Sequence, residues 1–207
     1  DHFTDRVGVL GFNMQFRRNW GWEITLVSGL AKEEEKKFTS TDVNINMWVA
    51  TSPKWRAFFS TGLSKTYNFS REYLAYYSWV NGNFQWRIFD VLNIGSSLNV
   101  FIEANPQNQI EDITINSRPF FSLTPVNNLK IRLYLDNVYL RSSDRLEQLI
   151  GGLLFSYNFR PKSWVYLAIN EVQDRSDEFD HLGNLLPNRL HVTDRASVVK
   201  LKYLFYF

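Results

Sequence analysis

The feature that most constrains the fold is a series of about eleven segments in which apolar and polar residues alternate with a period of two. Such alternation places one set of side chains on each face of an extended strand, whereas a helical face repeats about every 3.6 residues. No segment of the 207 residues shows a convincing helical pattern. The sequence therefore predicts an all-β chain.

Turn-forming residues separate these segments and set their expected bounds. The predicted strands are residues 7–16, 20–30, 39–50, 55–65, 73–88, 93–103, 112–123, 129–140, 147–159, 163–172 and the closing strand 195–207. In the fifth segment Tyr73, Ala75, Tyr77 and Trp79 form the first apolar set, and the phase changes near residues 81–83. A change of phase within one strand predicts a β-bulge there.

The lengths of the segments and of their connections point to one architecture. Most segments have about 10–13 residues, whereas a globular strand has about 5–6 and a bilayer-crossing strand about 9–11. The expected links alternate between short (17–19, 51–54, 89–92, 124–127, 160–162) and long (31–37, 67–72, 104–111, 141–146, 173–194). Short periplasmic turns and long extracellular loops are typical of outer-membrane barrels. We expect a single domain, residues 1–207, that forms an antiparallel up-and-down transmembrane β-barrel.

Composition agrees with this expectation and excludes other classes. Aromatic residues make up 16% of the chain, and several flank the short links, where an interfacial girdle would lie: Trp20, Trp22, Trp55, Trp86, Phe159 and Trp164. No run of 18 apolar residues predicts a membrane-spanning helix. The net charge of +2, without a basic cluster, gives no indication of a nucleic-acid partner, and the absence of cysteine removes thiol and disulfide chemistry.

The number of segments has a consequence for the whole chain. Bacterial barrels have an even number of strands with both termini in the periplasm, whereas eleven strands would start the chain at the cell surface. We therefore expect the C-terminal portion of a longer protein, lacking at least one strand. The alternative is that one segment near residues 70–90 is wrongly merged or split. The first residues, DHFTDRV, lack a signal-peptide pattern, so any signal is expected to be cleaved or to lie upstream.

The closing segment alternates between an apolar face and a charged face. Val199 and Leu201 continue into Tyr203, Phe205 and Phe207, while Lys200 and Lys202 point the other way. In a soluble protein an apolar C-terminal strand of this kind would promote aggregation. The pattern resembles the final strand by which bacterial barrels are recognised by their assembly machinery. We interpret Tyr203, Phe205 and Phe207 as this assembly signal.

Two C-terminal stretches resemble a known family. The hairpin FRP-KSW-YLAINE (residues 159–171) and the ending DRA…KLKYLFYF are similar to the C-terminal barrel of a family of large, poorly characterised Gram-negative outer-membrane proteins. Members of that family carry an N-terminal sandwich similar to carbohydrate-binding modules. The resemblance covers about the last quarter of the chain. It implies outer-membrane residence and a larger parent chain, and it brings no catalytic residues.

Charged residues on the strand faces opposite the lipid are the main candidate functional group. In a barrel they would point into the lumen; they are Glu23, Arg56, Arg87, Arg118, Lys130, Arg132, Asp136, Lys200 and Lys202. Seven of these nine are cations, so a water-filled lumen would favour anionic solutes. A plugged, non-conducting barrel remains an equal alternative at this stage.

Catalytic and metal-binding patterns are sparse. Asp174, Asp177 and Asp180 could supply oxygen ligands to Ca²⁺, although the spacing lacks the glycine and final glutamate of an EF-hand loop. His181 and His191 in the same long loop are the best candidates for hydrolase chemistry. No cofactor motif is present.

We therefore expect a non-enzymatic outer-membrane protein that acts as a transport or pore component, an anchor or a subunit of an envelope assembly. Its expected partners are outer-membrane lipid and lipopolysaccharide, the barrel assembly machinery and other envelope proteins. An outer-membrane hydrolase that uses the loop histidines is one alternative. A soluble β-sandwich or lipocalin-like binding protein is the other.

Overall fold

The computed structural model describes residues 5–33, 36–175 and 189–204, and every described element is a β-strand. The strands are β1 (Asp5–Phe16), β2 (Trp20–Glu33), β3 (Lys36–Ser52), β4 (Trp55–Asn68), β5 (Tyr73–Phe89), β6 (Leu92–Ala104), β7 (Ile110–Val126), β8 (Leu129–Leu140), β9 (Arg145–Arg160), β10 (Ser163–Arg175) and β11 (Leu190–Lys202).

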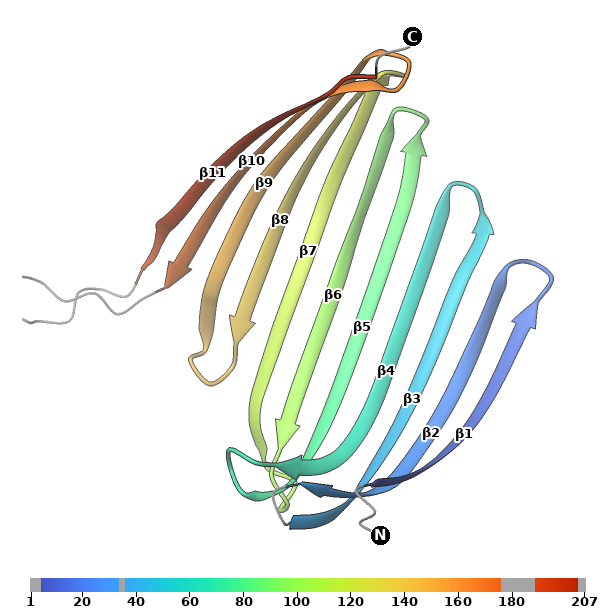
Figure 1. Ribbon diagram of the computed structural model, residues 1–207, viewed down its shortest axis with the longest axis vertical. Helices are drawn as coiled ribbons and strands as arrows, with labels where there is room; N and C mark the ends of the chain where they lie inside the picture. The colour runs from blue at the N-terminus through green and yellow to red at the C-terminus, as the bar shows by residue number, and fades with distance from the viewer. Residues whose placement is uncertain (1–4, 34–35, 176–188, 205–207) are drawn as a thin grey trace, which may run out of the picture. The chain divides into compact units, whose positions relative to one another are not determined.

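The eleven strands lie in one sheet in the order of the sequence, from β1 to β11, each joined to the next as a hairpin (Figure 1). The registers of the β1–β4 and β8–β11 pairs are antiparallel. The predicted all-β, antiparallel up-and-down fold is confirmed. The alternative of a merged or split segment near residues 70–90 is wrong, because β5 is one strand of 17 residues.

Two expected boundaries are wrong. The link expected at 31–37 is strand up to Glu33 and again from Lys36, and the register pairs Lys32 with Lys37 and Glu33 with Lys36. The run of charged residues ends the apolar alternation, but backbone pairing continues through it because strand pairing does not depend on an apolar face. The closing strand begins five residues earlier than expected, at Leu190, and ends at Lys202; Phe205 and Phe207 lie outside the described residues.

The strand bounds sort the links by length. Links after β1, β3, β5, β7 and β9 span residues 17–19, 53–54, 90–91, 127–128 and 161–162. Those after β4, β6, β8 and β10 span 69–72, 105–109, 141–144 and 176–189, and only the link at 34–35 departs from the alternation. Five of these links hold a non-glycine residue in the left-handed region, at Asn19, Glu72, Asn108, Asp144 and Lys162. A single left-handed residue of this kind closes a tight turn between antiparallel strands.

The chain divides into two compact units. Unit 1 comprises Asp1–Phe84, Leu98–Ile115 and Arg141–Ser143, and unit 2 comprises Gln85–Ser97, Asn116–Leu140 and Asp144–Phe207. In unit 1 the register aligns Phe12 with Ile24, Ile24 with Ile45, and Ile45 with Thr61 across β1–β4. The apolar face of unit 1 follows from this alignment and carries Leu10, Phe12, Met14, Trp22, Ile24, Leu26, Val43, Ile45, Met47, Phe59 and Leu63.

The opposite, polar face of unit 1 contains two aromatic rings that lie over glycines. A Cβ added to Gly21 would overlap the ring of Trp48, and one added to Gly62 would overlap the ring of Trp79. Gly62 pairs with Asn44, so Trp79 lies on the same side of the sheet as Asn44. Glycine is required at these two positions because only a residue without a side chain leaves room for the neighbouring ring.

The position of Trp79 corrects the expected phase of β5. Trp79 belongs to the polar face, and Ala75, four residues before it, is completely buried. Tyr76, one step out of phase, lies beneath the ammonium group of Lys65, 5.3 Å from its ring centroid. Tyr76 is therefore on the apolar side, in the same alternation as Phe84, and no bulge between them is needed to explain the pattern.

Unit 2 has the same two-faced construction. Leu133 pairs with Leu153, Leu153 with Ile169, and Ile169 with Ser197 across β8–β11. The apolar face of unit 2 carries Leu129, Ile131, Leu133, Leu135, Leu153, Phe155, Tyr157, Val165, Leu167, Ile169, Val199 and Leu201. Trp164 pairs with Asn158 and Lys202 on the opposite face, so its expected place in a lipid-facing girdle is wrong.

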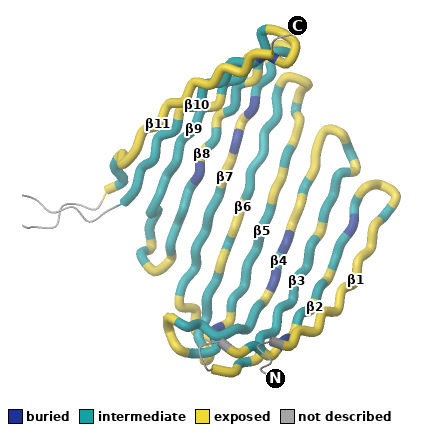
Figure 2. Tube along the Cα trace, viewed as in Figure 1, coloured by how far each residue is buried: buried dark blue, intermediate teal, exposed yellow. Residues whose placement is uncertain are grey.

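Very little of the described chain forms a buried core. Ala75 and Phe120 are the buried hydrophobic residues in the described ranges, while many large apolar side chains are exposed. Figure 2 shows accordingly that only a few short stretches of the trace are buried. Leu10 is 71% exposed, Leu63 64% and Val199 72%. Soluble proteins rarely expose contiguous apolar surface on this scale. The apolar faces therefore need a cover that the chain itself does not supply in the described residues.

Candidate functional site

The polar face of unit 2 brings hydroxyl and ammonium groups together in one row. Lys130 of β8 pairs with Ser156 of β9, Ser156 pairs with Tyr166 of β10, and Tyr166 pairs with Lys200 of β11. Paired residues of antiparallel neighbours point to the same face, so the four side chains form one transverse row. We call it the Lys130–Lys200 row. Both lysines are exposed, and Ser156 and Tyr166 are half-buried.

Arg132 lies next to this row on β8. Its guanidinium carbon is 4.1 Å from the centroid of the Phe120 ring, a cation–π contact. The Arg132 Nε is buried and has no hydrogen-bond partner. Buried polar atoms are nearly always paired, so this nitrogen is a donor that lacks its acceptor within the described chain.

A second arginine on the same face is neutralised. Arg118 of β7 donates from Nε to Oδ2 of Asp136 at 2.9 Å, and its Nη2 contacts the same oxygen. Asn116 donates to the other carboxylate oxygen at 2.9 Å. Asp136 is 4% exposed. Its buried carboxylate is hydrogen-bonded to the side chains of Arg118 and Asn116. The ion pair joins β7 to β8, and both oxygens of the buried Asp136 carboxylate accept hydrogen bonds from side chains of β7.

Tyr134 fixes the neighbouring strands by reaching across one of them. Its ring lies over Gly152 of β9, where an added Cβ would overlap the ring. Its hydroxyl donates to Asn170 Oδ1 on β10 at 2.7 Å. Glycine at 152 is therefore what allows one tyrosine to connect β8 with β10, and the Arg118 guanidinium lies 5.8 Å from the same ring.

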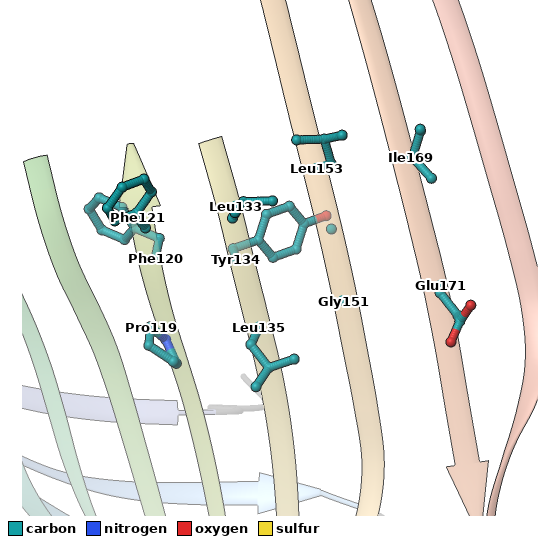
Figure 3. A pocket seen from close by; sticks show the side chains of 11 residues that line it. Pro119, Phe120, Phe121, Leu133, Tyr134, Leu135, Gly151, Leu153, Ile169 and Glu171 are labelled. Carbon is teal, nitrogen blue, oxygen red and sulfur yellow. The ribbon is translucent and has the colours of Figure 1, made fainter. Parts of the chain in front are cut away.

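The opposite side of the same strands has a shallow groove. Gly151 has open space where a side chain would be, and Pro119, Phe121, Leu133, Leu135, Leu153 and Ile169 surround it (Figure 3). Glu171 closes one end, where Arg195 donates to its carboxylate at 2.8 Å. The groove is wide open and almost wholly apolar, so it offers no constellation for catalysis.

Three further predicted lumen residues, Glu23, Arg56 and Arg87, lie on β2, β4 and β5. Glu23 accepts hydrogen bonds from Asn13 at 3.1 Å and from Thr25 at 3.3 Å, on the polar face of β1–β2. Arg56 precedes Ala57 of the apolar face and so alternates to the polar side. Arg87 lies in the part of β5 that belongs to unit 2. Their assignment to a lumen stays a prediction.

A separate ion network joins the ends of several strands in unit 1. Lys36 donates to the Tyr67 hydroxyl at 2.7 Å and lies 3.7 Å from Glu72. The Tyr67 hydrogen bond and, after it, the Glu72 charge raise the pKa of Lys36. Arg71 lies 3.6 Å from Glu103 and 3.0 Å from Glu111. These contacts tie together the ends of the strands beside the longer links, and they are structural because every charge has an opposite partner.

The remaining predicted residues are only partly described. Tyr203 stacks on Phe159 with ring centroids 6.2 Å apart, and its hydroxyl accepts a hydrogen bond from Arg160 at 3.0 Å. Phe205 and Phe207 lie outside the described residues. The role of the three as an assembly signal stays a prediction.

Of the long-loop candidates for metal binding and hydrolysis, only Asp174 and His191 lie within the described residues. Asp174 accepts hydrogen bonds from Gln148 at 2.8 Å and Thr193 at 2.9 Å, while Asp177 and Asp180 lie outside the described residues. Within the described part of the chain no three metal-ligating side chains gather. His191 Nδ1 lies 3.1 Å from the Arg189 carbonyl, and His181 is outside the described residues.

Sequence reasoning identified the cations of this face but missed Ser156, Tyr166 and the Tyr134–Asn170 contact. The two-residue link at 161–162 was not a sufficient signal, because the register that starts from Ser163 and Arg160 would place Tyr157 opposite Tyr166. A register shift between Ser163 and Trp164 places Ser156 there instead. The contact in which Tyr134 crosses Gly152 and reaches Asn170 of β10 could not be predicted, because the alternation within one strand gives no information about a contact two strands away.

The fold and this face define a protein class: a single antiparallel meander sheet with one apolar and one polar face in each unit. No helix in the described ranges is long and apolar enough to span a membrane. No family model matches the chain, and no curated protein matches it. Among solved structures the chain is similar to the NanC porin, with a TM-score of 0.45 and 11% identity, over 96% of this chain and 94% of the porin chain. At this TM-score the likeness carries no inference about function.

Proposed function

We propose that the chain is part of a non-enzymatic outer-membrane β-barrel that passes small anions through its interior. The single observation that carries the proposal is the two-faced sheet with almost no buried core. Lipid is the cover that matches such apolar faces, since a barrel in the outer membrane turns apolar side chains outward and polar ones inward.

The charge of the polar face supports the anion preference. In unit 2 that face carries Lys130, Arg132, Lys200 and Lys202, and the carboxylate of Asp136 on the same face is already paired with Arg118. An excess of fixed positive charge in a confined space raises the local concentration of anions. If the barrel conducts anions, these four cations line the permeation path.

The membrane part of the proposal is tested by Leu133→Cys and Leu154→Cys, one on each face of unit 2. Both side chains are exposed, Leu133 by 49% and Leu154 by 40%, and the chain has no native cysteine. A spin label at 133 should collide mostly with oxygen in the lipid phase. A label at 154 should collide mostly with a water-soluble nickel complex. Equal water accessibility at both sites, or recovery of the protein without detergent, would support the soluble alternative.

The anion preference is tested by single-channel recording in a potassium chloride gradient. We expect a zero-current potential displaced toward the chloride equilibrium value. A displacement toward potassium would contradict the anion preference. A folded, membrane-inserted protein without conductance would instead support the plugged barrel, acting as an anchor or as a subunit of an envelope assembly.

A further inference from the structure

We propose that the Lys130–Lys200 row, together with Arg132, is a binding site for a small dicarboxylate that carries hydroxyl groups between its two carboxylates. This inference rests on the proposed function, because it places the solute on the polar face. It goes further by naming the residues and the chemistry of the solute.

The order of groups along the row is the first argument. Across β8, β9, β10 and β11 the paired residues read ammonium, hydroxyl, hydroxyl, ammonium. Three strand spacings separate Lys130 from Lys200, about 14 Å between their backbones. Each lysine has a flexible four-carbon stem, so the two ammonium groups can approach a bound anion from opposite ends. A solute with a carboxylate at each end and hydroxyls in the middle matches this order.

The absence of competing carboxylates is the second argument. The neighbouring row pairs Arg132 with Leu154, Leu154 with Ala168, and Ala168 with Val198, and it contains no acidic residue. On the other side Asn158, Trp164 and Lys202 follow one another. Within the described residues, Lys130, Lys200 and Arg132 form no ion pair. Their charges are thus available to a solute, in contrast to that of Arg118.

The state of Arg132 is the third argument. Its Nε is buried without an acceptor, and its guanidinium carbon lies over the Phe120 ring, 4.1 Å from the centroid. A guanidinium that is already positioned can bind a carboxylate with little further loss of side-chain freedom. Because residues two apart on a strand share a face, Arg132 lies beside Lys130 and would add a second cation at the β8 end of the solute.

The experiment measures binding of tartrate, succinate and gluconate to the full chain in detergent by titration calorimetry. Tartrate has two carboxylates with hydroxyls between them, succinate lacks the hydroxyls, and gluconate has one carboxylate. We expect tartrate to bind more tightly than either of the other two. Lys130→Gln or Lys200→Gln should weaken tartrate binding at least about tenfold, since each removes a charge-assisted contact. Lys162→Gln removes the same charge in the β9–β10 link and should leave binding unchanged.

The outcomes separate this inference from the proposed function. Absence of tartrate binding, or equal loss in Lys162→Gln, overturns the site even if the channel still prefers anions. If succinate binds as tightly as tartrate, Ser156 and Tyr166 do not recognise the solute's hydroxyl groups. If gluconate binds as tightly as tartrate, Lys130 and Lys200 do not each bind one carboxylate. Tartrate binding that depends on Lys130 and Lys200 supports the site even in a barrel that does not conduct. Arg132→Gln should weaken binding as the lysine variants do.

Discussion

Gly151 and Gly152 are adjacent in sequence but face opposite sides of β9, and they have opposite requirements. Gly152 lies under the Tyr134 ring, whereas nothing lies within 4 Å of the position that a Cβ of Gly151 would take. One residue is a glycine because a ring occupies its side-chain space. The other, Gly151, has no side chain and lies at the floor of an open groove.

We therefore predict that Gly152→Ala destabilises the folded protein by about 1–3 kcal/mol, the usual cost of overpacking. The added methyl group displaces the Tyr134 ring and breaks its 2.7 Å hydrogen bond to Asn170. Gly151→Ala is the matched control and should be neutral or slightly stabilising. Urea unfolding of the detergent-folded protein measures both. Equal effects of the two substitutions would contradict the proposed contact.

Asp136 illustrates a buried charge that depends on its partners. Asp136→Ala removes the acceptor of Arg118 and of Asn116. We predict a loss of about 1–3 kcal/mol, because the Arg118 side chain left behind is 52% exposed and can bind water. Arg118→Ala leaves the buried carboxylate uncompensated and should cost more, about 3–5 kcal/mol, whereas the double variant should cost clearly less than the sum. Additive losses in a double-mutant cycle would show that the pair is not coupled.

At the scale of the strands, the two faces of β4 give a direct comparison. Leu63 is 64% exposed on the apolar face, and Ser64 follows it on the polar face, paired with Asp42. We predict that Leu63→Arg reduces stability by about 2–4 kcal/mol, the cost of arginine on a lipid-facing strand near the bilayer midplane. Ser64→Arg should be tolerated, because Asp42 offers a partner of opposite charge. Folding into lipid vesicles and the heat-dependent shift of the folded band report the outcome, and equal tolerance of both would argue against lipid on this face.

Strand identity was predictable from sequence because each strand repeats one simple period. The bounds of β8 were predicted without error, since apolar residues alternate with polar or charged ones from Leu129 to Asp136 and turns flank both ends. The ends of β2 and β3 were not, because the alternation stops at the charged residues 32–37 although the pairing continues. The phase of β5 was also missed. Trp79 is large and apolar, and only the glycine on the neighbouring strand shows that it belongs on the polar face.

The candidate site was predictable only in part. Its cations follow from alternation within single strands, as for Lys130 and Arg132 or Lys200 and Lys202. The row itself depends on three registers at once, and a shift of one residue in any of them would separate Ser156 from Tyr166 or Tyr166 from Lys200. The burial of Arg132 Nε and its position over Phe120 depend on side-chain packing, on which the alternating pattern carries no information.

At the scale of the whole chain, link length predicts orientation. Links after odd-numbered strands have two or three residues, and four of the five after even-numbered strands have four or more. In outer-membrane barrels the short turns are periplasmic and the long loops are extracellular. If the chain is such a barrel, the ends of the strands near the Arg71 network face outward and those near the 127–128 and 161–162 links face the periplasm.

Orientation can be measured in intact cells with Ser142→Cys and Asn127→Cys. Ser142 lies in the link after β8 and Asn127 in the two-residue link after β7. Both are exposed, so a difference in labelling cannot come from burial in the protein. We predict that a maleimide unable to cross the outer membrane labels residue 142 in intact cells and residue 127 only after the membrane is opened. Labelling of residue 127 alone in intact cells would reverse the assigned orientation. Equal labelling of both before and after opening would contradict a membrane between them, because the two sites would then share one compartment.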